Sequence, residues 1–282
     1  MGILDALATS PALLITAMVL LGLLTGSFLN VVILRLPRML ENAWREEASA
    51  ILEVEAPKDQ PALSLARPAS HCTHCGAPIP AWRNIPVVSW LLLRGRAACC
   101  GAPISVQYPL VELLAGVVAG LCAWRFGWSW ELLAAYVLAM TLIAAAVIDW
   151  NTQLLPDNIT LPLLWLGLLL NTMETFVPLQ AAVLGAAAGY LSLWSVFMLF
   201  KLVTGKEGMG FGDFKLLAAL GAWFGWTALP MLLLLSSLVG AVIGITFRVS
   251  GRLEAGAPMP YGPFIAGAGL LWLLAPMPMA LF

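Results

Sequence analysis

Two aspartates beside apolar segments are the residues of this sequence best suited to catalysis. Asp149 ends one apolar segment and Asp213 begins another. Charged groups at such positions are costly in a membrane, which indicates a function. Two carboxyls held about 3 Å apart share one proton, so one takes a proton from water while the other donates a hydrogen bond to a scissile carbonyl. This is the chemistry of an aspartic protease, which hydrolyses a peptide bond without a covalent intermediate.

The residues before Asp213 favour catalysis over a purely structural role. Three glycines precede it at alternate positions, Gly208, Gly210 and Gly212. Positions without side chains let a substrate strand lie close to backbone amides. By itself, however, an aspartate at a helix start is usually a cap, and one before a loop is usually solvated. A catalytic pair and two structural aspartates therefore both stay open from these residues.

Two further carboxylates have simpler interpretations. Asp157, in Leu-Pro-Asp157-Asn-Ile-Thr, predicts the N-cap of the helix that follows. Glu112 lies one turn into another apolar segment. It makes either a polar contact within a helix bundle or a contact with a substrate.

Four of the five cysteines lie in one polar stretch and form a small repeat. Two pairs of cysteines are each followed directly by Gly-Ala-Pro-Ile. The first pair is Cys72 and Cys75, and the second is the adjacent Cys99 and Cys100. The repeat predicts two knuckles of a zinc ribbon, in which tight turns present thiolates to the metal. A reducing cytosol favours metal over a disulfide. Superposing the repeats, however, pairs Cys72 with Ala97, so the usual first cysteine of the second knuckle is missing.

The fourth zinc ligand therefore has three candidates. Cys99 stands two residues late in the repeat, His71 directly precedes Cys72, and His74 lies between Cys72 and Cys75. The firmer ligands are Cys72, Cys75 and Cys100. A loop with reduced thiols and no metal is the plain alternative.

The composition excludes an ordinary soluble enzyme. Of 282 residues, 61% are hydrophobic and 10% charged, against roughly 25% charged in a typical globular domain. The mean hydropathy is +0.92. A disordered chain is excluded for the same reason, and a net charge of −1 gives no reason to expect nucleic acid. The chain is expected to be a polytopic membrane protein.

Apolar segments long enough for membrane helices are expected at 11–34, 107–124, 130–149, 159–173, 180–202, 213–227, 229–247 and 261–277. Among the loops between them, Arg125 alone carries positive charge on one side, while the other side holds the remaining lysines and arginines. This bias predicts that the long loop after the first span is cytoplasmic and that both termini lie outside.

The expected fold is an all-α polytopic membrane protein with about eight transmembrane helices and a cytoplasmic zinc-ribbon-like insertion between the first two. Its expected domains are the first helix at 1–34, a cytoplasmic domain with the cysteine knuckles at 35–106, and a catalytic bundle of about seven helices at 107–282.

In their order along the chain, these motifs resemble those of the type IV prepilin peptidases, which are leader peptidases and N-methyltransferases of bacterial inner membranes. The matching segments are Gly26 to Pro37, Cys72-x-x-Cys75, Asn84 to Arg96, Cys100 to Ser105, Tyr108 to Glu112, Asp149 to Asp157, Gly210 to Lys215 and Tyr261 to Phe264. The resemblance implies that Asp149 and Asp213 are the catalytic pair, the second within a Gly-x-Gly-Asp motif shared with presenilin-like intramembrane proteases.

The resemblance also implies substrates, cofactors and supporting residues. The substrates are prepilins and type II secretion pseudopilins, cut after Gly on the cytoplasmic side, and the lipid bilayer surrounds the enzyme. Methylation of the new N-terminal amine uses S-adenosylmethionine, and the region of Gly95 is implied for that reaction. The departure at Ala97 concerns the zinc ligands, not the protease. Residues expected near the substrate or in support are Gly210, Gly212, Lys215 and Glu112.

Two other classes of function are compatible with the same residues. In a transporter or channel, Asp149, Asp213 and Glu112 would line a path for protons or metal ions. That class usually shows two related halves, and the sequence contains no such internal repeat. A zinc-stabilised scaffold without chemistry would leave the glycine-bracketed Asp213 unexplained.

Overall fold

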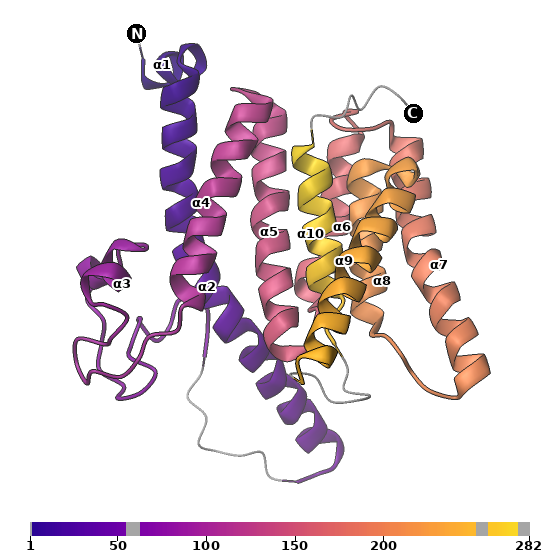
Figure 1. Ribbon diagram of the computed structural model, residues 1–282, viewed down its shortest axis with the longest axis horizontal. Helices are drawn as coiled ribbons and strands as arrows, with labels where there is room; N and C mark the ends of the chain where they lie inside the picture. Colours follow the sequence, from indigo (N-terminus) through magenta and orange to yellow (C-terminus); the bar gives the residue numbers. More distant parts are fainter. Residues whose placement is uncertain (1, 55–62, 252–258, 276–282) are drawn as a thin grey trace. The chain divides into compact units, whose positions relative to one another are not determined.

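The computed structural model describes residues 2–54, 63–251 and 259–275, and the regular structure in these ranges is helical apart from two isolated β-bridges. The α-helices (Figure 1) are α1 (Ile3–Thr9), α2 (Pro11–Ile51), α3 (Val88–Leu92), α4 (Gln107–Phe126), α5 (Trp130–Thr152), α6 (Asp157–Asn171), α7 (Leu179–Thr204), α8 (Phe211–Phe224), α9 (Leu229–Val249) and α10 (Gly262–Leu274). Two 3₁₀ helices, η1 (Ala81–Asn84) and η2 (Trp226–Ala228), complete the set for the described residues.

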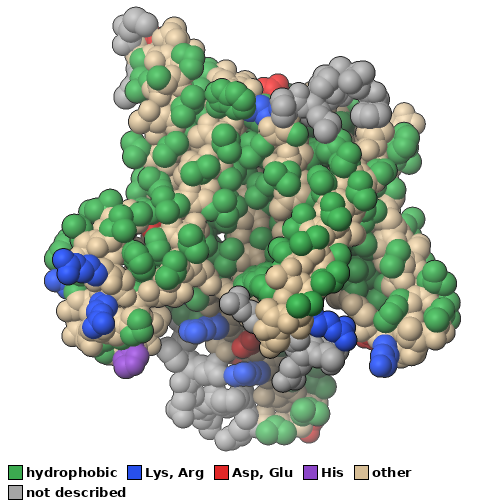
Figure 2. Space-filling model, viewed as in Figure 1, with side chains coloured by type: hydrophobic (Ala, Val, Ile, Leu, Met, Phe, Trp, Pro, Cys, Tyr) green, Lys and Arg blue, Asp and Glu red, His purple; other side chains and the backbone are tan. Residues whose placement is uncertain are grey.

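The described ranges contain five helices long and apolar enough to cross a membrane: α2, α4, α5, α7 and the stretch Trp226–Val249 formed by η2 and α9. The chain is therefore a multi-pass membrane protein. The other three expected spans coincide with α6, α8 and α10, of 15, 14 and 13 residues. At 1.5 Å per residue such helices are about 20–23 Å long, short of the roughly 30 Å hydrocarbon core. Hydrophobic side chains cover the helix sides seen in Figure 2.

The helix that contains the first expected span is longer than hydropathy indicates. The segment 11–34 is only the first part of α2, which continues through Pro37 to Ile51. Beyond Pro37 the residues are mostly Glu, Ala, Arg and Leu, which favour helix whether or not they are apolar. Helix propensity thus extends α2 into sequence that hydropathy assigns to the loop.

The chain forms two compact units, Met1–Trp128 and Ser129–Phe282. In the first unit, small residues let the backbones of α2 and α4 approach closely. A methyl group on Gly22 would lie 2.5 Å from the carbonyl oxygen of Ala115, and one on Gly26 would lie 2.7 Å from Cα of Glu112. This small-residue packing is a common way for membrane helices to associate.

In the second unit, α6, α7 and α10 pack on α8, and α10 also packs beside α5 (Figure 1). Every residue of α8 from Phe214 to Phe224 is buried except Lys215. At the end of α8, Trp223 Nε1 donates to the carbonyl of Leu163 at 2.8 Å, and Asn171 Nδ2 donates to the carbonyl of Ala222 at 2.8 Å. These buried hydrogen bonds attach α6 to α8.

Contact between Gly185 of α7 and Gly221 of α8 leaves no room for a side chain, because a methyl group on either would overlap the backbone of the other. We expect Gly185→Val to destabilise the second unit by about 1–3 kcal/mol or more, as overpacking does. The apparent melting temperature in detergent measures this. The matched control is Ala187→Val on the exposed side of the same helix, and equal melting temperatures for the two variants would refute the predicted role of this contact.

Candidate active site

Asp149 lies near the end of α5, with 5% of its surface exposed. Its Oδ2 accepts a hydrogen bond of 2.9 Å from the backbone amide of Gly262, the first residue of α10. The first amides of a helix have no acceptor within the helix, and the helix dipole attracts negative charge there. The start of α10 therefore holds the Asp149 carboxyl in one orientation.

Asp213 lies in the first turn of α8, with 7% of its surface exposed. Its Oδ1 is buried and has no hydrogen-bond partner among the described residues. Asp149 lies close enough for its charge to act on Asp213, so the structure brings together two aspartates that lie far apart in the sequence. An unpaired buried carboxyl oxygen is costly, and it has no hydrogen bond within the described residues to give up when water or a substrate reaches it.

Leu155 packs against the backbone beside both aspartates. A methyl group on Gly262 would lie 2.6 Å from Asp149 Oδ2 and 2.9 Å from Leu155 Cδ1. A methyl group on Gly212 would lie 2.6 Å from Leu155 Cβ. These two glycines are therefore required by close approach, and a side chain at either would move a wall of the site.

The three glycines before Asp213 have different surroundings. Gly212 packs on Leu155, and a methyl group on Gly208 would lie 2.8 Å from the ring of Phe200. Gly210, the N-cap residue of α8, has no neighbour within 4 Å of such a methyl group among the described residues. Only Gly210 thus has the open surroundings that a substrate strand beside the backbone requires.

Lys215 and Asp157 form an ion pair between α8 and α6. Lys215 Nζ lies 2.6 and 2.8 Å from the two carboxylate oxygens of Asp157. The expectation that Asp157 caps α6 was wrong: the N-cap residue is Pro156, and no side chain caps this helix. Asp157 is the first residue of α6, and its carboxylate binds Lys215 instead.

Glu112 is a buried residue of α4 in the first unit. Its Oε2 accepts a hydrogen bond of 2.7 Å from the amide of Val87, and it also accepts one from the hydroxyl of Ser27. It therefore makes polar contacts within its own unit.

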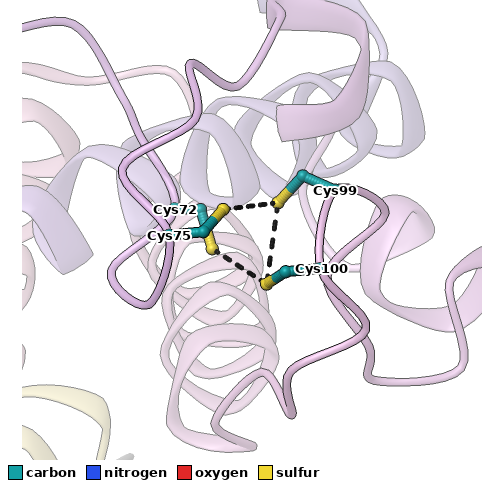
Figure 3. Close-up of side chains that lie close together, drawn as sticks. All are labelled: Cys72, Cys75, Cys99 and Cys100. Carbon is teal, nitrogen blue, oxygen red and sulfur yellow. Dashed lines mark hydrogen bonds between the residues drawn. The ribbon is translucent and has the colours of Figure 1, made fainter.

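The four cysteines of the two knuckles converge (Figure 3), with all four Sγ atoms within 4.8 Å of one another. The Sγ–Sγ distances are 3.8 Å for Cys72–Cys100, 3.3 Å for Cys75–Cys99 and 3.9 Å for Cys99–Cys100. A tetrahedral zinc ion with Zn–S bonds of about 2.3 Å requires sulfurs about 3.8 Å apart. The cluster is thus compatible with zinc in both ligand type and spacing.

The sequence repeat is also a structural repeat. An isolated β-bridge joins His71 to Pro78 in the first knuckle, and an equivalent one joins Arg96 to Pro103 in the second. Equivalent positions of the two knuckles are therefore 25 residues apart in the sequence. At this offset Cys99 occupies the place of His74. Ala97 takes the place of Cys72 and makes the same two backbone hydrogen bonds, to residues four and five positions later. The second knuckle therefore keeps its fold and supplies its extra thiol from the His74 position.

Backbone amides adjust the acidity of the cluster. Hydrogen bonds from the amides of Cys75 and then His74 lower the pKa of Cys72 to about 6. The hydrogen bond between Cys75 and Cys99 raises the pKa of Cys99 to about 12. The amide hydrogen bonds thus favour the thiolate form of Cys72, which is the form that binds metal ions.

Comparison with known proteins places both units in one family. The model for the bacterial Peptidase A24 N-terminal domain matches residues 20–126, and the model for the type IV leader peptidase family matches residues 136–245. The chain belongs to the type IV leader peptidase family. The junction between the two matches coincides with the boundary between the two compact units.

Relatives within this family are similar over nearly their full length. The prepilin leader peptidase/N-methyltransferase of Stutzerimonas stutzeri is 52% identical over 95% of this chain and 94% of its own. The proteins of the same name from Pseudomonas aeruginosa and Neisseria gonorrhoeae are each 52% identical, over 97% and 90% of this chain and 94% and 87% of their own. No solved structure matches this chain.

Two residues with evident roles in the structure were given none by the sequence patterns. Gly262 holds Asp149, and Asn30 has a buried acceptor without a partner among the described residues. A Gly-Pro pair before an apolar run does predict a helix start with free amides, but not which carboxylate they bind. For Asn30, the signals were a polar residue within an apolar segment and its place in the matching segment Gly26 to Pro37, and neither assigned it a role.

Proposed function

We propose that this chain is a prepilin leader peptidase and N-methyltransferase. It removes the leader from type IV prepilins and type II secretion pseudopilins after a glycine, and then methylates the new N-terminal amine. The observation that carries the peptidase function is the buried pair of Asp149, oriented by an amide of α10, and Asp213, whose Oδ1 is free. Family membership and the names of the relatives support both activities.

The two carboxyls act as base and acid in turn. The ionised one takes a proton from water, and the water oxygen bonds to the scissile carbonyl carbon while the protonated one donates a hydrogen bond to the carbonyl oxygen. As the tetrahedral intermediate collapses, the C–N bond breaks and the carboxyl that took the proton from water gives it to the amine nitrogen, which returns the pair to its starting state. Because Gly262 engages one oxygen of Asp149, the other oxygen and Asp213 Oδ1 are the groups left to face water and substrate.

The residues around the pair support it without taking part in the bond chemistry. Open space at Gly210 lets the leader strand lie beside the start of α8, while Gly212 seats Leu155 next to the pair. Lys215 joins α8 to α6 through Asp157. Residues of this kind position the reacting groups. Such positioning accounts for much of the rate enhancement that enzymes achieve.

We place the chain in the bacterial inner membrane with about eight spanning segments, the short α6, α8 and α10 included. The cysteine knuckles and the aspartate pair face the cytoplasm in this arrangement, because the loops on that side carry nearly all of the positive charge. The apolar segment of a prepilin then lies in the bilayer with its leader junction at the cytoplasmic surface.

The cysteine cluster binds one structural zinc ion in this proposal, and the ligands are Cys72, Cys75, Cys99 and Cys100. Among the described residues, the two knuckles contain no helix and bury few side chains. Zinc bound to both knuckles would therefore stabilise their fold. S-adenosylmethionine supplies the methyl group for the second reaction. Gly95, the residue implied for that reaction, has φ +69° and packs on Trp90, where a methyl group would lie 3.0 Å from the indole.

Zinc content distinguishes Cys99 from the histidines as the fourth ligand. We expect one zinc per chain in the wild type and a large loss in Cys99→Ser, measured by elemental analysis of purified protein. His74→Ala is the matched control, because the His74 ring lies outside the sulfur cluster, and it should keep its zinc. Loss of zinc in His74→Ala with retention in Cys99→Ser would reverse the assignment.

The proposed function is tested with purified protein in detergent and a prepilin substrate. Release of the leader, and methylation of the product when S-adenosylmethionine is added, are the expected results, read by mass spectrometry of the pilin N-terminus. An intact prepilin after incubation with the wild-type protein would overturn the peptidase function and leave transport or scaffolding as the alternatives.

A further inference from the structure

We propose that a cavity in the first unit binds S-adenosylmethionine, with Glu112 of α4 and Asn30 of α2 as its buried polar contacts. The proposal rests on the methyltransferase function above and deepens it by naming a site. Neither residue belongs to the cysteine knuckles, so membrane helices supply the contacts that orient the methyl donor.

The cavity has a volume of about 430 Å³ and is enclosed by α2, the start of α4, the two cysteine knuckles and the segment around α3. Small-molecule sites typically measure about 300–1,000 Å³ and combine apolar walls with a few polar groups. The volume of this cavity lies within that range, and its lining combines apolar side chains with many polar ones. Its polar and aromatic side chains include Asn30, Arg35, Arg38, Trp90 and Glu112.

Asn30 is the strongest sign that the cavity holds a ligand. It is 3% exposed, and its Nδ2 donates to the carbonyl of Tyr108 at 3.1 Å, which fixes the side chain. Its Oδ1 is buried and has no partner among the described residues. A buried acceptor without a donor is unfavourable, and Asn30 lines the cavity. An N–H or O–H group of a ligand that displaces the atoms covering Oδ1 would satisfy it.

Glu112 gives the cavity a fixed negative charge. Val87 and Ser27 hold the carboxylate by hydrogen bonds, and in the part of unit one that the structure describes it is the acidic residue that lines this cavity. A carboxylate in surroundings of low dielectric attracts a cation strongly. The sulfonium and ammonium groups of S-adenosylmethionine are cations of this kind.

The remaining polar and aromatic groups match the other parts of the same molecule. Arg38 and Arg35 line the cavity, and Arg35 also donates to the carbonyl of Ser64 at 3.0 Å. Guanidinium groups suit the carboxylate of an amino acid. Trp90 is anchored through Nε1 to the carbonyl of Ile104 at 3.2 Å and offers an aromatic surface to the adenine ring.

Binding of radiolabelled S-adenosylmethionine to the full chain in detergent, measured by equilibrium dialysis, tests this site directly. Glu112→Gln keeps an acceptor for the Val87 amide but removes the charge, and we expect it to weaken binding at least tenfold. The loss should be smaller for S-adenosylhomocysteine, which lacks the sulfonium charge. Asn30→Leu should also weaken binding at least tenfold. The matched control is Thr16→Val, because Thr16 is exposed on α2 and bonds only the carbonyl of Ala12.

The outcomes separate this proposal from the proposed function. If Glu112→Gln binds S-adenosylmethionine as the wild type does, the cavity is not the donor site and the inference is overturned. Weaker binding of a pre-cleaved pilin by this variant, with unchanged binding of S-adenosylmethionine, would also overturn it, because the cavity would then hold the acceptor amine. A wild-type protein that cleaves prepilin but neither binds nor transfers the methyl group would instead refute the methyltransferase function itself.

Discussion

Replacing either Asp149 or Asp213 with asparagine is expected to lower the rate of leader cleavage by about 10³-fold, because general acid–base catalysis contributes about 10²–10⁴-fold. Asparagine keeps the shape of each side chain but can neither take a proton from water nor pass one on. The measurement is the single-turnover rate of leader release from a prepilin in detergent. A double variant should be little slower than either single one, because the two residues act as a unit.

The controls for the aspartate variants separate lost chemistry from lost structure. Glu131→Gln makes the same acid-to-amide change at the other end of α5, where Glu131 lies in the first turn, and it should cleave like the wild type. Methylation of a pre-cleaved pilin should survive Asp149→Asn and Asp213→Asn. If either aspartate variant cleaves at more than about a tenth of the wild-type rate, the catalytic assignment is wrong.

Gly262→Ala is expected to lower leader cleavage by about 10²-fold, which is the loss that a displacement of about 1 Å causes at a catalytic group. The added methyl group would lie 2.6 Å from Asp149 Oδ2, too close for two nonbonded atoms. The carboxyl must therefore move away from the amide that orients it, although that amide is still present. The effect should fall on the rate of bond cleavage rather than on prepilin affinity.

Gly267→Ala is the matched control, because it lies in the same helix and an added methyl group there has no neighbour within 4 Å among the described residues. It should retain full activity and the wild-type melting temperature. Equal cleavage rates for Gly262→Ala and Gly267→Ala would show that the α10 amide does not position Asp149.

Local patterns in the sequence were sufficient for the class of protein and for the candidate residues. Each expected span coincides with a helix, because hydropathy and helix propensity depend on residues within one or two turns. Asp149, Asp213 and the cysteines were identifiable because ionisable and thiol groups in such settings are uncommon unless they act. Hydropathy by itself failed for the end of α2, and the Leu-Pro-Asp-Asn pattern failed for the cap of α6.

Tertiary structure alone decided what each candidate residue contacts. The partner of Asp149 is an amide 113 residues away, and the fourth sulfur of the cluster comes from the position that His74 occupies in the first knuckle. The free acceptor of Asn30 becomes apparent only once α4 and the knuckles enclose it. Such contacts depend on how distant segments pack, whereas hydropathy and short motifs report only on neighbours along the chain.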